Sequence, residues 1–161
     1  MFRETWTGTC MVLKVDQRIF WVDTSFLYAL FVASDQNHGA ATRVWREFCT
    51  SRMTGVISPF ILSELGTLLA YRFSHAVALE QTAAVFDSSI LRCVYPDAKI
   101  IGDAMEWWRR FKDKRFSFAD CVSFECMRTL NIRTALSFDG DFAVAGFGRV
   151  GSEGEWEMLG I

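Results

Sequence analysis

Two apolar runs in the chain are each followed at once by a strong helix-capping signal. The run Ile19–Val22 precedes Asp23, which is a favoured helix N-cap before an amphipathic stretch. The run Gly55–Ile57 precedes Ser58-Pro59, a favoured pair for the N-cap and the first position of a helix. Strands that lead directly into helices predict crossover connections and a parallel sheet covered on both faces.

The same alternation continues along the chain. We expect further helices at about 40–52, 76–90 and 118–130 and another after Asp97, with further strands at 92–95 and 134–138. The expected fold class is α/β, with three layers and a central, mainly parallel sheet flanked by helices. We expect residues 18–161 to form one domain, because 161 residues with 51% hydrophobic content suit a single core. Residues 1–17 carry no periodic pattern and are expected to be an N-terminal appendage, unless translation starts at Met11.

Composition indicates where in the cell the protein is expected and what kind of surface it has. The formal charge of -2 provides no global basic signal, so any affinity for nucleic acid must come from local patches. The five cysteines are an odd number without a CxxC pair, which indicates a reducing cytoplasm. No apolar stretch approaches the length of a membrane helix, and the first apolar run is too short for a signal peptide. We therefore expect a soluble cytoplasmic protein without membrane association.

Four acids are placed where they can meet. Asp23 and Asp139 each follow a predicted strand, and Glu64 and Asp120 lie in helices that adjoin the same sheet edge. Each has an ordinary structural explanation as well. Asp23 suits a helix N-cap, Asp120 suits a capping box with Ser117, and Asp139 precedes a glycine as in many turns.

Glu64 is the acid that a structural explanation fits least well. Ile61 and Leu68, three residues before it and four after it, place it on the stripe that faces the core. A buried carboxylate needs a partner, so we expect a metal ion or a hydrogen-bond donor beside it. A cluster of oxygen ligands favours Mg²⁺ or Mn²⁺, and His38 and His75 have no metal-ligand spacing.

Four short blocks of the sequence resemble the signature blocks of PIN domains, especially VapC-type toxin ribonucleases. The blocks are Phe20–Ser25, Ser63–Leu65, Phe118–Cys121 and Ser137–Phe142, and their order and spacing match the family over about residues 19–150. The resemblance implies that Asp23, Glu64 and Asp120 hold a catalytic Mg²⁺ or Mn²⁺, with Asp139 as the fourth acid. It also implies that Ser25 and Ser137 support the acids or face the substrate. Asp141 remains an alternative to Asp139 or a ligand beside it.

The resemblance also implies a function. It predicts hydrolysis of RNA phosphodiester bonds by the toxin of a toxin–antitoxin pair, with a cognate antitoxin and a homodimer as partners. Without a suitable histidine pair, we expect water to be the nucleophile.

A catalytically silent α/β interaction module, with the acids acting as caps, is the alternative from another functional class. A phospho-acceptor receiver domain is disfavoured, because Asp23 is followed by Thr24 and Ser25 rather than by a second acid.

A basic run lies shortly before the helix that carries Asp120. Its residues are expected either to contact RNA phosphates or to form an ordinary solvated helix end, and the sequence favours neither; they are Arg109, Arg110, Lys112, Lys114 and Arg115. The neighbouring pair Trp107-Trp108 suits core or dimer packing better than base stacking. Asp103 and Glu125 are interpreted as solvent-facing charges without a functional role.

Overall fold

The computed structural model describes residues 18–151 and residue 155. In these residues, a five-stranded sheet has the strand order β3-β2-β1-β4-β5, and every neighbouring pair is parallel. The strands are β1 (Ile19–Val22), β2 (Thr54–Ile57), β3 (Leu91–Cys93), β4 (Thr134–Leu136) and β5 (Gly148–Val150). All strands therefore end at one edge of the sheet, here called the carboxyl edge, and begin at the opposite, amino edge.

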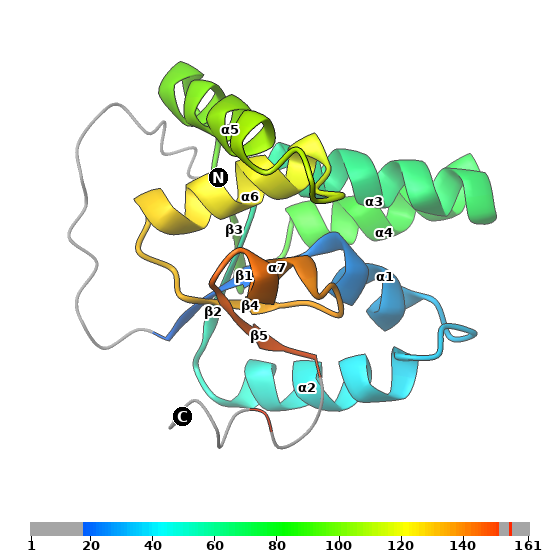
Figure 1. The fold of residues 1–161 in the computed structure, drawn as a ribbon. Coiled ribbons are helices and arrows are strands. Elements are labelled where there is room, and N and C mark those ends of the chain that lie inside the picture. The colour runs from blue at the N-terminus through cyan, green and yellow to red at the C-terminus, as the bar shows by residue number, and fades with distance from the viewer. Residues whose placement is uncertain (1–17, 152–154, 156–161) are drawn as a thin grey trace.

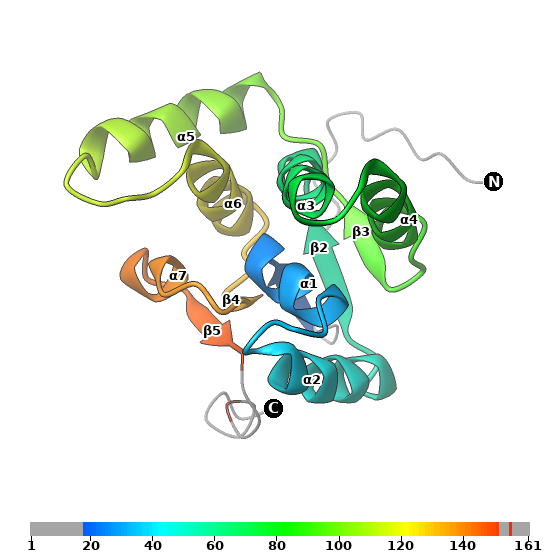
Figure 2. The same ribbon diagram turned by 90° about the vertical axis from the view of Figure 1, so that its right-hand side faces the viewer.

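Helices cover both faces of this sheet. They are α1 (Thr24–Phe31), α2 (His38–Thr50), α3 (Pro59–Arg72), α4 (His75–Phe86), α5 (Ala98–Arg110), α6 (Phe118–Thr129) and α7 (Asp141–Val144). Figure 1 shows α3, α4, α5 and α6 on one side of the sheet and α2 on the other. Figure 2 looks onto the carboxyl edge, with α1 in front of it. The predicted three-layer α/β fold is confirmed.

The core lies on both faces of the central strands. Trp21 of β1 and Phe124 of α6 are fully buried, and Leu65 anchors α3 in the same core. Gly55 of β2 is required by close packing, because a Cβ atom there would lie 2.3 Å from Leu91 Cδ2 and 2.8 Å from Val22 Cγ2. The tight contact of three neighbouring strands thus explains a glycine in the middle of the sheet.

Several boundaries differ from those predicted. β5 was not predicted, and Asp141, expected in a turn, begins the one-turn helix α7. The last predicted strand is shorter and ends at Leu136, since Ser137 and the residues after it turn toward α1. His38 and His75 are the first residues of α2 and α4. In the described part of the chain, no helix is long and apolar enough to cross a membrane.

Candidate active site

Asp23 lies at the carboxyl edge, directly after β1, and is the N-cap of α1. Its side chain is buried, and its Oδ2 atom accepts hydrogen bonds from Ser25 N at 3.1 Å, Ser25 Oγ at 2.5 Å and Ser137 Oγ at 2.9 Å. Burial raises the pKa of Asp23 to about 6, although these hydrogen bonds oppose the rise and the negative charge of Asp120 adds to it. The cap interpretation is confirmed, but this carboxylate is also held in an environment that disfavours its charge.

Ser25 and Ser137 form one hydrogen-bonded network around Asp23. Their hydroxyl oxygens lie 3.1 Å apart. Ser25 Oγ accepts from the backbone N–H of Phe138 at 3.0 Å, and Ser137 Oγ accepts from that of Asp139 at 2.9 Å. The two serines therefore fix the start of α1 against the segment after β4, and so they set the position of Asp139 relative to Asp23.

Glu64 occupies a different place on α3 from the one predicted. The buried stripe of this helix is Ile61, Leu65 and Leu69, whereas Leu68 is 43% exposed and Glu64 is half-buried. The prediction that Glu64 lies on the core stripe is therefore wrong. The expected hydrogen-bond donor is present, because Thr24 Oγ1 donates to Glu64 Oε2 at 2.7 Å. Sequence reasoning did not assign a role to Thr24, although it directly follows Asp23.

Asp120 is a helix-capping residue and also lies near the other acids. It completes the capping box of α6, in which Asp120 Oδ2 accepts from Ser117 N at 2.7 Å and Ser117 Oγ accepts from Asp120 N at 3.0 Å. Burial raises the pKa of Asp120, the bonds with Ser117 oppose the rise, and the negative charges of Asp139 and Glu64 add to it. The carboxylate of Asp120 therefore interacts electrostatically with those of Asp23, Glu64 and Asp139, which belong to three other segments of the chain.

Asp139 and Asp141 differ in their relation to this cluster. Asp139 Oδ1 accepts from the backbone N–H of Asp141 at 2.9 Å, as in a capped turn. Partial burial raises the pKa of Asp141 and the negative charge of Asp139 adds to the rise, whereas Asp139 also acts on Asp120. This difference favours Asp139 over Asp141 as the fourth acid.

The described hydrogen bonds engage one oxygen of each of these four carboxylates. They are formed by Oδ2 of Asp23, Oε2 of Glu64, Oδ2 of Asp120 and Oδ1 of Asp139. The second oxygen of each is left for another ligand, and an all-carboxylate set suits a hard cation such as Mg²⁺ or Mn²⁺. Among the described residues, no three Asp, Glu, His or Cys side chains form a ready-made metal-binding group.

The basic run lies at the end of α5 and in the loop before α6. Figure 2 shows this loop on the side of the molecule onto which the carboxyl edge faces. Arg109 pairs with Glu106, and Lys114 Nζ lies 3.2 Å from Asp113 Oδ2, both at the exposed surface. Lys112 and Arg115 are exposed, and the Arg110 guanidinium lies 5.5 Å from the centre of the Phe111 ring. Such exposed pairs are weak and leave these cations accessible to phosphate.

Glu125 was wrongly interpreted as a solvent-facing charge. It is buried in α6 and receives hydrogen bonds from Arg128 Nη2 at 2.6 Å, Arg128 Nε at 2.9 Å and Trp107 Nε1 at 3.2 Å. Burial alone would raise the pKa of this carboxyl, but the bonds from Arg128 and Trp107 outweigh it and lower the pKa. Glu125 thus joins α5 to α6, whereas Asp103 pairs with Lys99 at the surface, as expected. Trp107 also packs on Phe124, which confirms its role in the core.

Comparison with known proteins identifies the family to which the chain belongs. The PIN domain family model matches residues 20–148. The chain is 39% identical over 135 residues to the 23S rRNA-specific endonuclease VapC20 of Mycobacterium tuberculosis, covering 84% of this chain and 100% of VapC20.

Two solved structures share the fold. The crystal structure of M. tuberculosis VapC20, described as a sarcin–ricin loop cleaving toxin, superposes with a TM-score of 0.73 at 38% identity, covering 80% of this chain and 95% of that one. VapBC2 of Rickettsia felis, bound to a DNA fragment from its promoter, has a TM-score of 0.61 at 14% identity, covering 81% and 96%, and supports the fold alone. This chain therefore belongs to the PIN-domain family and, within it, to the VapC ribonuclease toxins.

Proposed function

We propose that this chain cleaves 23S ribosomal RNA in the sarcin–ricin loop, in a reaction that depends on Mg²⁺ or Mn²⁺. The observation that carries the proposal is the set of four acids at the carboxyl edge, each with one carboxylate oxygen outside the described hydrogen bonds. The identity of 39% to a 23S rRNA-specific endonuclease supports the choice of substrate.

Asp23, Glu64, Asp120 and Asp139 would hold the metal. A divalent ion, when bound, polarises a phosphoryl oxygen and lowers the pKa of coordinated water. The chain's own contribution is to fix the acids, because Ser25 and Ser137 hold Asp23 and Thr24 holds Glu64. Ser117 fixes Asp120 at the amino end of α6, an end that favours anions such as an RNA phosphate.

We propose water, rather than the ribose 2′-hydroxyl, as the nucleophile. The described histidines, His38 and His75, stand at the starts of α2 and α4, where no pair can act together as general acid and base. His38 Nδ1 is engaged with the carbonyl oxygen of Ala29 at 2.8 Å. Cleavage should leave 5′-phosphate and 3′-hydroxyl ends, and mass spectrometry that finds a 2′,3′-cyclic phosphate would contradict this step.

The basic run and the partners complete the proposal. We propose that the exposed side chains of Lys112, Lys114 and Arg115 contact phosphates of RNA that enters from the carboxyl edge. We further propose a cognate antitoxin, a homodimer and a cytoplasmic location. Co-expression with an antitoxin gene adjacent to that of the toxin should restore growth, and sedimentation should give twice the mass of one chain.

Incubation of the purified protein with intact ribosomal RNA tests the proposed substrate. Primer extension on 23S and 16S rRNA should show one strong Mn²⁺-dependent cut, located in the sarcin–ricin loop of 23S rRNA. The Asp120→Asn variant should lose the cut while remaining folded, because asparagine keeps much of the capping ability but loses the charge. Asp103→Asn, which removes a surface acid of α5, is the matched control and should cut normally. Cleavage spread over both RNAs, or equal cutting by Asp120→Asn, would overturn the proposal.

A further inference from the structure

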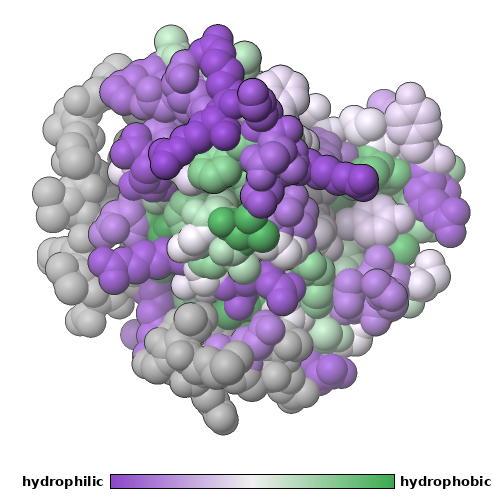
Figure 3. All heavy atoms as spheres, in the orientation of Figure 1, coloured by the Kyte–Doolittle hydropathy of each residue, from purple (hydrophilic) through white to green (hydrophobic). Residues whose placement is uncertain are grey.

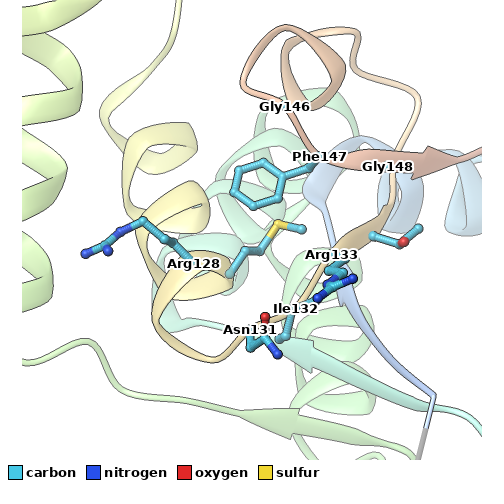
Figure 4. Close-up of a pocket in the computed structure, with 9 residues that line it drawn as sticks. Arg128, Asn131, Ile132, Arg133, Gly146, Phe147 and Gly148 are labelled. Atoms are coloured by element: carbon cyan, nitrogen blue, oxygen red, sulfur yellow. The ribbon is translucent and has the colours of Figure 1, made fainter.

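An open hollow of about 580 Å³ lies at the amino edge of the sheet, opposite the acids. It is bounded by the end of α6 and by the residues that lead into β4 and β5. Figure 4 shows Phe147 on one side of the hollow, and Asn131, Ile132 and Arg133 on the other. The hollow is not part of the proposed active site. The residues that line it indicate which kind of ligand it can bind.

The hollow has an apolar floor. Met127 and Ile132 are buried, and Phe147 is half-buried with its ring stacked on Phe124 at a centroid distance of 5.8 Å. Figure 3 shows hydrophobic residues in the middle of the face over α6 and α7, with hydrophilic residues around them. The partly exposed ring of Phe147 offers a planar surface on which a nucleobase can stack.

The rim of the hollow is polar and positively charged. Asn131 is exposed in a left-handed conformation with φ of 54°, and its side-chain amide forms no hydrogen bond within the described residues. Arg133 is exposed and has no ion pair in the part of the chain that the structure describes. Arg18 directly precedes β1 and Arg133 directly precedes β4, which is the strand next to β1, so both arginines lie at the amino edge of the sheet. Arg18 is exposed and likewise lacks a described acid partner.

The direction of α6 determines which part of a nucleotide fits inside. The helix ends at the hollow, so its last carbonyl groups give this end a partial negative charge that disfavours an anion. Arg128, at the same end, is already bound to Glu125 through two hydrogen bonds. A base is therefore favoured inside the hollow, and its phosphate is favoured outside, beside Arg133 and Arg18.

The hollow lies within reach of the acids along α6. Asp120 stands in the first turn of this helix and Arg128 in the last, so eight residues at 1.5 Å each separate the two ends by about 12 Å. A nucleic-acid strand that advances about 3.4 Å along its axis per nucleotide spans this distance in about four nucleotides. One folded RNA loop can thus engage both ends of α6.

We propose that the hollow is a second RNA-binding site, which takes an unstacked base of the substrate while Arg18 and Arg133 bind the adjoining phosphates. The inference rests on the proposed RNA substrate and adds a contact remote from the acids. Proteins commonly recognise RNA through bases that leave the stack in loops and bulges. Such a contact would let the enzyme select a folded loop and reject short single strands that carry the same cleavage sequence.

Binding of a fluorescent sarcin–ricin hairpin, measured by anisotropy in chelator so that no cleavage occurs, tests the proposal. The double variant Arg18→Ala/Arg133→Ala should bind at least tenfold more weakly, and the slope of log affinity against log salt should fall by about 1.5. The matched control Arg46→Ala/Arg72→Ala removes two exposed arginines of α2 and α3 and should keep the wild-type affinity and slope. A hexanucleotide around the cut should be bound equally by all three proteins.

A second variant tests the base pocket in case the double variant does not fold. Asn131→Asp suits the left-handed conformation and adds a negative charge to the rim, so hairpin binding should weaken about fivefold at an unchanged melting temperature. Equal affinity and salt slope for the variants and the wild type would overturn the second site. Hairpin binding without any Mn²⁺-dependent cleavage would instead overturn the proposed function and leave the binding comparison valid. No hairpin binding by the wild type would overturn both.

Discussion

Replacement of Asp23 by asparagine should stabilise the metal-free protein at neutral pH. Asp23 is only 5% exposed, and burial raises its pKa from the ordinary value of 3.8 to about 6. Because one pKa unit corresponds to about 1.4 kcal/mol, holding this charge in the folded state costs about 3 kcal/mol. Asparagine carries no charge, and its side-chain oxygen can accept the same hydrogen bonds from Ser25 and Ser137.

The sign of the pH dependence follows from the direction of the shift. Between pH 3.8 and about 6, folded Asp23 keeps a proton that the unfolded chain has lost, so the contribution of Asp23 to stability falls as pH rises. Asp23→Asn has no such group. The free energy of unfolding of Asp23→Asn relative to wild type should therefore rise through this window and level off above about pH 7, by at most about 3 kcal/mol.

Urea unfolding in chelator at several values between pH 4.5 and 7.5 measures this difference. Asp103→Asn is the control, because Lys99 lowers the pKa of Asp103 below the ordinary value of 3.8. Asp103 is therefore ionised in both the folded and the unfolded protein throughout this range, and its loss should give a difference that does not change with pH. Saturating Mn²⁺ should then stabilise wild type more than Asp23→Asn, since the variant lacks a ligand. A difference between the two proteins that is constant with pH, or that falls as pH rises, would refute the reasoning.

Three further outcomes are expected. Thr24→Val should weaken Mn²⁺ binding in calorimetry about tenfold by releasing Glu64, whereas Thr24→Ser should bind normally; equal affinities would show that this hydroxyl does not orient the acid. Asp139→Asn should reduce the cleavage rate more than Asp141→Asn, and the reverse order would make Asp141 the fourth acid. Gly55→Ala should lower the free energy of unfolding by about 1–3 kcal/mol, because its Cβ would overlap side chains of both neighbouring strands; an unchanged urea midpoint would contradict this.

The sequence predicts those strands and helices whose residues carry a recognisable pattern within a few positions. β1 with Asp23 and β2 with Ser58-Pro59 combine a short apolar run with a capping residue, and both lead into helices as expected. β5 has no such signal, because Gly148–Val150 is a strand only through its pairing with β4. A strand of three residues that depends on a distant partner leaves no periodic pattern of its own.

The burial of individual acids also depends on contacts that a sequence pattern does not show. Helical periodicity identifies an apolar face of α3 but not its borders, and Leu68 is exposed although it continues the pattern around Glu64. Glu125 is buried because α5 covers α6 on that side. The signal that could have found its partner is Arg128, three residues later on the same helix, where oppositely charged side chains meet.

The central claim is that the four acids at the carboxyl edge form one metal-dependent catalytic centre. Single-turnover cleavage of the sarcin–ricin hairpin, followed over a Mn²⁺ titration, tests it most directly. Wild type should show no cleavage in chelator and a saturable rise with Mn²⁺, and Glu64→Gln should need more metal to reach half its maximal rate. Asp120→Asn should not cleave at any Mn²⁺ concentration. Cleavage by wild type in chelator, or the same titration curve for all three proteins, would contradict the claim.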